Sequence, residues 1–190
     1  EIKKEMPENF YEKRRIGEND SYICELIRND LIKEFVIHVT QNNYYLDSTI
    51  VPSIYETNQF LIHNDINRNS NNKMNNNPTL IEYAAFYGSI QIFQYLRFNN
   101  VELGESLWYY AIHGNNPEII HLLEENSVQL NQINVFVESI ECHHNDIANY
   151  FQNNFLKNNE DDLYYTFQNS LKYYNFSFIS SDLINQNSFL

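Results

Sequence analysis

Two consecutive stretches of the chain decide the fold, TLIEYAAFYGSIQIFQYLRFNNVEL (79–103) and SLWYYAIHGNNPEIIHLLEENSVQL (106–130). With an offset of 27 residues, identical residues of the two stretches fall in register. The pairs are Leu80 and Leu107, Tyr83 and Tyr110, Ala84 and Ala111, Ile92 and Ile119, Leu96 and Leu123, Val101 and Val128, and Leu103 and Leu130. Self-similarity at such a period is typical of repeat architectures, in which each unit buries its apolar face against its neighbours.

The first copy has the signals of two short helices. Thr79 and Glu82 have the spacing of a capping box, which predicts a helix starting after Thr79. Gly88 is expected to end that helix, and Ser89 to cap a second one. Apolar residues recur at helical spacing within each half, so each half predicts an amphipathic helix.

The second copy has equivalent signals at equivalent places. Ser106 is expected to cap the first helix, and the sequence Gly-Asn-Asn (114–116) to end it. Pro117 then falls at the first position of the following helix, where its missing N–H group costs nothing. Trp108, the single tryptophan, is expected in the core, and Tyr109 in a structural role.

A third, weaker copy follows, in which HHNDIANYF (143–151) aligns with NNPEIIHLL (115–123). The sequence therefore predicts an all-α solenoid of helix pairs forming a single domain over 1–190. Its predicted parts are repeats 79–105, 106–133 and 134–155, divergent helical flanks 1–62 and 160–190, and an Asn-rich loop 63–78.

The flanks predict further helices. Residues 21–39 resemble another helix pair, and SIYETNQFLI (53–62) predicts a helix that starts at Pro52 and Ser53. A last helix is expected from Asp161 or Asp162, with an apolar face. That face consists of Leu163, Phe167 and Leu171.

Composition and charge limit the classes of protein to which this chain can belong. Apolar residues make up 43% of the chain, and it has only four Gly and four Pro, which excludes a wholly disordered or collagen-like protein. The net charge is −13, of which residues 79–190 carry −10. Because nucleic acids and anionic membranes are bound mainly by cations, neither is an expected partner.

The cysteines and the hydropathy of the sequence indicate in which cellular compartment the protein is expected. Cys24 and Cys142 are far apart in the sequence and form no paired motif, so a reducing compartment fits best. No apolar run has the length of a membrane span or of a signal peptide. We therefore expect a cytoplasmic protein.

The block 79–101 resembles an ankyrin repeat. The matching residues are Thr79, Ile81, Ala84, Ala85, Gly88, Ile92, Phe93, Leu96 and Val101, preceded by Asp65, Ile66, Asn67 and Arg68, which resemble the opening of an ankyrin finger. The chain departs from the family at Leu80, Glu82 and Asn100, and its period is 27 residues where ankyrin repeats have about 33. With this shortened finger it resembles a divergent ankyrin-like domain family of unknown function that is abundant in protists.

The resemblance implies non-enzymatic protein–protein interaction. In ankyrin proteins the partner contacts the finger and the two positions after the paired alanines. Those positions correspond here to Phe86 and Tyr87 in the first copy and to His113, followed by Gly114, in the second; the finger contributes Asn67, Arg68 and Asn69. The alternative is that Phe86 or Tyr87 packs inward against a neighbouring unit.

Two functions of different classes remain open from the sequence. In the first, an acidic concave surface binds a basic or amphipathic segment of a partner protein. In the second, the chain self-associates through uncapped terminal repeats that carry Phe176, Phe178 and Phe189.

The sequence gives little support for a catalytic or metal-binding site. Cys142, His143 and His144, with His113 and His121 one repeat away, could in principle form a thiolate–imidazole pair or a zinc site. No second cysteine or short ligand spacing completes such a set. We therefore expect no catalytic residue, no metal and no cofactor, and a cysteine-dependent hydrolase using Cys142 is the remaining enzymatic alternative.

Overall fold

The computed structural model describes residues 7–63, 77–156 and 160–179, and within them regular structure is helical apart from one isolated bridge between Thr49 and Thr79. The described residues form eleven α-helices and a 3₁₀ helix. These are α1 (Phe10–Ile16), α2 (Tyr22–Arg28), α3 (Ile32–Gln41), α4 (Gln59–His63), α5 (Leu80–Tyr87), α6 (Ile90–Phe98), α7 (Ser106–His113), α8 (Pro117–Glu125), α9 (Gln132–Glu141), α10 (Asn145–Phe155), α11 (Glu160–Lys172) and η2 (Phe176–Phe178). The prediction of an all-α fold is confirmed.

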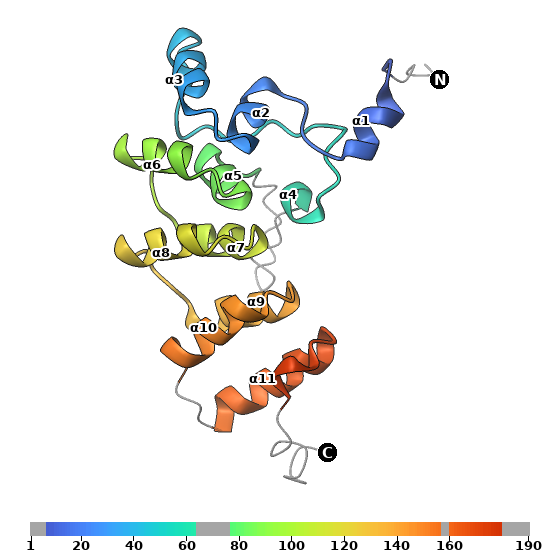
Figure 1. Cartoon of the computed structure of the whole chain (residues 1–190), viewed down its shortest axis with the longest axis vertical. Coiled ribbons are helices and arrows are strands. Elements are labelled where there is room, and N and C mark those ends of the chain that lie inside the picture. Colours follow the sequence, from blue (N-terminus) through green and yellow to red (C-terminus); the bar gives the residue numbers. More distant parts are fainter. Residues whose placement is uncertain (1–6, 64–76, 157–159, 180–190) are drawn as a thin grey trace. The chain divides into compact units, whose positions relative to one another are not determined.

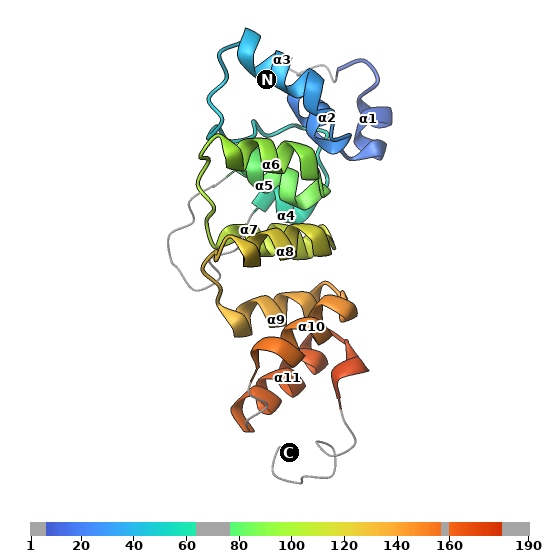
Figure 2. The ribbon, with the colours of Figure 1, turned by 60° about the vertical axis from the view of Figure 1, so that its left-hand side comes forward.

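The chain divides into two compact units, Glu1–Glu102 and Leu103–Leu190. In the first unit the pair α2–α3 packs on the pair α5–α6, first helix on first helix and second on second (Figure 1). In the second unit α7 packs on α9 and α9 packs on α11, while α8 and α10 pair with α7 and α9 (Figure 2). Helix pairs thus stack within each unit, and the predicted single domain over 1–190 stays a prediction.

Every first helix of a pair ends in the same backbone turn. One residue in each turn has a left-handed conformation, and the N–H group of the next residue donates to the carbonyl five positions earlier, at 2.9–3.1 Å. The left-handed residues are Asp30, Gly88, Asn115, His143 and Tyr174. This bond pattern is the Schellman motif, which satisfies helix carbonyls that otherwise have no partner. The predicted helix pairs at 21–39, 79–103, 106–130 and 134–155 are therefore confirmed.

Within each unit, side chains join one of these turns to the preceding one. The Ser89 hydroxyl donates to the carbonyl of Ile27, and the Asn175 amide donates to the carbonyl of Ile140 at 3.0 Å. Asp30 accepts from the backbone N–H groups at the start of α6, at 3.0 and 2.9 Å. Ser89 is the N-cap residue of α6, as predicted, but its side chain does not make the capping bond, because the carboxylate of Asp30 does so.

Three other helices were predicted to start at Thr79, Ser106 and Pro117, and each starts there or within one residue. Thr79 and Glu82 form the complete capping box, and Pro117 is the first residue of α8. Ser106 is not a cap but the first residue of α7. The carbonyls of Gly104 and Glu105 accept from the first N–H groups of this helix, which leaves no place for a side-chain cap.

The predicted helix 53–62 is wrong in its first half. Ser53 accepts from the N–H group of Tyr55, and Glu56 accepts from those of residues 57 and 58, so side chains form turns where a helix was expected. Asn58 then accepts from the N–H groups of residues 60 and 61 and starts the short helix α4.

The core follows the repeat pattern. Ile92, Phe93 and Leu96 on α6 are fully buried, as are Ile119 and Leu123 on α8. Trp108 and Tyr109 are also buried, which confirms the core position predicted for Trp108. Among the described residues, no helix is both long enough and apolar enough to span a bilayer.

Candidate functional site

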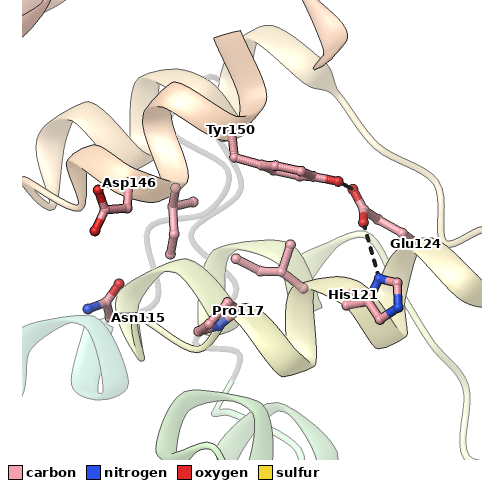
Figure 3. A pocket seen from close by; sticks show the side chains of 8 residues that line it. Asn115, Pro117, His121, Glu124, Asp146 and Tyr150 are labelled. Carbon is pink, nitrogen blue, oxygen red and sulfur yellow. Dashed lines mark hydrogen bonds and ion pairs between the residues drawn. The ribbon is translucent and has the colours of Figure 1, made fainter. Parts of the chain in front are cut away.

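A groove lies in the second unit between α8 and α10 (Figure 3). Its volume is about 390 Å³, and its floor is formed by the buried side chains of Ile120 and Ile147. At one end lie Asn115 and Asp146, and at the other end lie His121, Glu124 and Tyr150. The groove is thus apolar in the middle and polar at both ends.

Helical spacing explains why these residues meet. Asn116 caps α8 by accepting from the N–H group of Ile119 at 3.0 Å, which fixes where this helix starts. Residues three and four positions apart share a helix face. Ile120 and Glu124 therefore lie on one face of α8, and Asp146 and Tyr150 on one face of α10.

The polar end of the groove at Glu124 is held by hydrogen bonds. The Tyr150 hydroxyl donates to Oε1 of Glu124 at 2.7 Å, and Nδ1 of His121 lies 3.8 Å from Oε2 of the same carboxylate. The hydrogen bond to Glu124, together with burial, raises the pKa of Tyr150 to about 12. Tyr150 is therefore a neutral hydrogen-bond donor to Glu124 at physiological pH.

The charge around the groove has one sign. Its lining includes two carboxylates, Glu124 and Asp146, and no lysine or arginine. The second unit as a whole has eleven acidic residues against Lys157 and Lys172, a net formal charge of −9. An apolar floor between carboxylates is suited to binding an apolar side chain with cationic neighbours; it has no feature of a phosphate site.

The predicted site residues of the first unit contact other aromatic side chains. Phe86 is half-buried and stacks on Phe60 of α4, with ring centroids 6.2 Å apart. Tyr87 is also half-buried, and its ring centroid lies 4.8 Å from that of Tyr83. The guanidinium of Arg28 lies 6.0 Å from the centroid of the Tyr87 ring. Burial raises the pKa of Tyr87 to about 12. Both residues therefore keep only part of their surface available for a partner.

The predicted site residue His113 lies in the second unit and contacts α9. Its Nε2 is 2.7 Å from Oε1 of Glu138, and Cys142 lies beside both. Burial lowers the pKa of the neighbouring His144. The structure thus brings His113 and Cys142 together, while Glu138 was not anticipated from the sequence.

The remaining predicted contacts cannot be placed. Asn67, Arg68 and Asn69 lie outside the described residues, as does nearly all of the predicted loop 63–78. At its two ends, His63 is the last residue of α4, and the carbonyl of Pro78 accepts from the N–H group of Ile50 at 2.7 Å.

The groove was not predicted from the sequence, because the resemblance to ankyrin repeats pointed to the first helices, where ankyrin proteins bind their partners. The alignment of the repeats did not indicate it either. Asp146 and Ile147 line the groove, but the residues aligned with them, Glu118 and Ile119, do not.

The fold and the groove define an all-helical protein of stacked helix pairs with an acidic-rimmed apolar groove. No protein-family model, no curated protein and no solved structure matches the chain.

Proposed function

We propose that this chain is a non-enzymatic protein-interaction module that binds a basic, amphipathic segment of a partner protein. The observation that carries the proposal is the α8–α10 groove, in which an apolar floor lies between two carboxylates. We place the binding there because the groove combines an apolar floor with two carboxylates. Phe86 and Tyr87 are half-buried in aromatic contacts, and His113 is bonded to Glu138.

The groove specifies the chemistry of the segment. A volume of about 390 Å³ over Ile120 and Ile147 accommodates one or two large apolar side chains. Lysine or arginine residues on either side of them would meet Asp146 at one end and Glu124 at the other. The net charge of the unit accelerates encounter with such a segment, so the association rate should fall as the salt concentration rises.

The proposal includes the fold family and the cellular location. The 27-residue period, the helix pairs and the recurrent turn support a divergent ankyrin-like module with short connections, such as residues 126–131 between α8 and α9. Cys24 and Cys142 are free thiols, which is consistent with a cytoplasmic protein.

Neutralising the two carboxylates tests the proposal. A peptide with an apolar centre and flanking lysines, selected on the wild-type chain from a display library, is titrated against Glu124→Gln/Asp146→Asn. We expect the Kd to rise about tenfold, because two partly exposed ion pairs together contribute about 1 kcal/mol or slightly more. The measurement is isothermal titration calorimetry at two salt concentrations.

The matched control is Glu105→Gln/Glu118→Gln, which removes the same charge from exposed positions in the same unit that do not line the groove. This variant should bind with nearly unchanged affinity and a slightly slower association rate. Equal weakening in both double variants would show that only the net charge matters, and the groove would not be the site.

A second candidate function, self-association, is favoured by the exposed side of the last helix. Leu171 is 43% exposed, although the residues at the equivalent position of the two preceding first helices, Ile112 and Ile140, are fully buried. The predicted apolar face of α11 is therefore wrong in part, since the buried residues among the described side chains of this helix, 163–172, are Thr166 and Ser170. Four aromatic side chains of α11 and the segment after it are also exposed, namely Tyr164, Tyr165, Tyr174 and Phe176.

Light scattering over a range of concentrations tests this candidate. We expect the mean mass to rise with concentration for the wild type and to stay at one chain for Phe176→Ser, with Tyr45→Ser, an exposed aromatic of the first unit, as the control. A single-chain mass at all concentrations would refute self-association. Phe178 is not a candidate contact, because it is buried beside Phe136 with ring centroids 6.0 Å apart, and Phe189 lies outside the described residues.

A further inference from the structure

We propose that His113, Glu138 and Cys142 form a zinc site that connects α7 to α9. The three residues each offer one ligand atom, and these atoms all lie within 4.8 Å of one another. The site is separate from the groove, since none of its residues lines it. The inference therefore does not depend on the proposed function.

Two packed helices bring the three ligands together. His113 is the last residue of α7, and α7 packs on α9. Glu138 and Cys142 are four residues apart, at the end of α9, so both side chains lie on the same helix face. An ion bound here would join two consecutive helix pairs.

The distances are close to those of a tetrahedral centre. Zinc binds histidine nitrogen and carboxylate oxygen at about 2.0–2.2 Å and thiolate sulfur at about 2.3 Å, which places neighbouring ligand atoms about 3.5 Å apart. Nε2 of His113 and Oε1 of Glu138 are 2.7 Å apart, so these two would separate slightly as the ion enters. The Sγ atom of Cys142 lies within 4.8 Å of both. Three protein ligands leave a fourth position for water.

Charge and burial favour a zinc ion. Glu138 is buried, at the position that Tyr83 and Tyr110 occupy in two other first helices. A cation beside it would add to the contact with His113 in offsetting the cost of burying a carboxylate. A zinc ion with one thiolate, one carboxylate and one neutral imidazole is electrically neutral. The His113 side chain is 22% exposed and Cys142 is partly exposed, so an ion can enter from solvent. An imidazole–thiolate set selects zinc over calcium or magnesium, which prefer oxygen ligands.

The test uses the untagged full chain, stripped of metal with a chelator. Titration with Co²⁺ should produce a thiolate-to-metal charge-transfer band together with visible bands of tetrahedral intensity, at one ion per chain. Zn²⁺ should then displace Co²⁺ and bleach both bands. Binding of Zn²⁺ is measured separately by competition with a chromophoric chelator.

Substitution of each ligand, in the variants Cys142→Ala, His113→Gln and Glu138→Gln, should weaken Zn²⁺ binding by more than about 100-fold, beyond the loss expected for residues that only orient ligands. Cys24→Ala and His121→Gln are the controls and should bind as the wild type does. Circular dichroism of each variant without metal shows whether it is folded. In case Glu138→Gln does not fold, protection of Cys142 from alkylation by Zn²⁺ in the wild type provides a test without substitution.

Absence of the charge-transfer band would overturn the proposal. It would also be overturned if Zn²⁺ failed to protect Cys142, or if Cys142→Ala bound Zn²⁺ as tightly as Cys24→Ala. Binding that depended on Cys142 but survived the substitution of both His113 and Glu138 would indicate a different ligand set and would contradict this one.

Discussion

Replacing Trp108 with alanine is expected to lower the free energy of unfolding by about 3–5 kcal/mol, the range for truncating a large buried aromatic side chain. The indole ring is 1% exposed, and its Nε1 donates to the carbonyl of Gln129 at 3.0 Å. It also lies edge-on to Phe151, with ring centroids 6.0 Å apart. The substitution therefore removes packing between α7 and α10 and leaves a carbonyl without its donor. Urea denaturation followed by circular dichroism measures the loss.

Two further variants separate these contributions. Trp108→Phe keeps most of the ring packing but cannot donate to the carbonyl of Gln129. We therefore expect this variant to lower the free energy of unfolding by about 1–2 kcal/mol. Tyr165→Ala truncates an exposed ring of α11 and should change stability by less than about 0.5 kcal/mol. If Trp108→Ala cost no more than Tyr165→Ala, the ring would not be in the core.

Replacing Gly17 with alanine is expected to lower the free energy of unfolding by about 2–4 kcal/mol. Gly17 ends α1 with φ of 78°, a left-handed conformation that strains a residue with a side chain. An added Cβ would also overlap Oγ1 of Thr57. Thr57 donates to the Gly17 carbonyl through its backbone N–H at 3.0 Å and its hydroxyl at 3.2 Å, so displacing it disturbs the contact between residues 17 and 57.

Gly104→Ala is the matched control for this substitution. A Cβ at Gly104 meets only an ordinary contact at 3.5 Å from the Ser106 hydroxyl. The same change of residue should there alter the unfolding free energy by less than about 1 kcal/mol. Equal effects at Gly17 and Gly104 in urea denaturation would refute the strained turn at Gly17.

The sequence predicted the helix pairs because local signals and the repeat agree. The Thr79–Glu82 capping box, Gly88 and Pro117 each depend on chemistry within one helix turn, and all three lie where they were expected. The alignment offset by 27 residues then extended these signals to regions where they are weaker.

Predictions failed where a distant residue competes with a local signal. Serine is a common capping residue, yet the side chain that accepts from the first N–H groups of α6 is that of Asp30, nearly sixty residues before Ser89. A helix was expected to start at Pro52 and Ser53, but the side chains of Ser53, Glu56 and Asn58 bond to nearby backbone N–H groups and favour turns. Neither competition can be recognised from spacing alone.

The candidate sites were harder to predict than the fold. The groove depends on the pairing of Glu124 with Tyr150, 26 residues apart, and no motif links them. For the proposed zinc site the sequence singled out His113 and Cys142, but it gave no reason to choose Glu138 among the many acidic residues. Only the packing of α7 on α9 brings the three together.

The central claim, that the groove between α8 and α10 binds a basic amphipathic segment, is tested most directly by methyl NMR of the isoleucine-labelled chain. The selected peptide is added stepwise to the wild-type protein, and the isoleucine methyl signals are followed. The account predicts the largest shifts at Ile120 and Ile147, which form the floor of the groove, with smaller shifts at Ile112 in the core of the same unit. Unchanged signals from Ile120 and Ile147 at saturating peptide would contradict it.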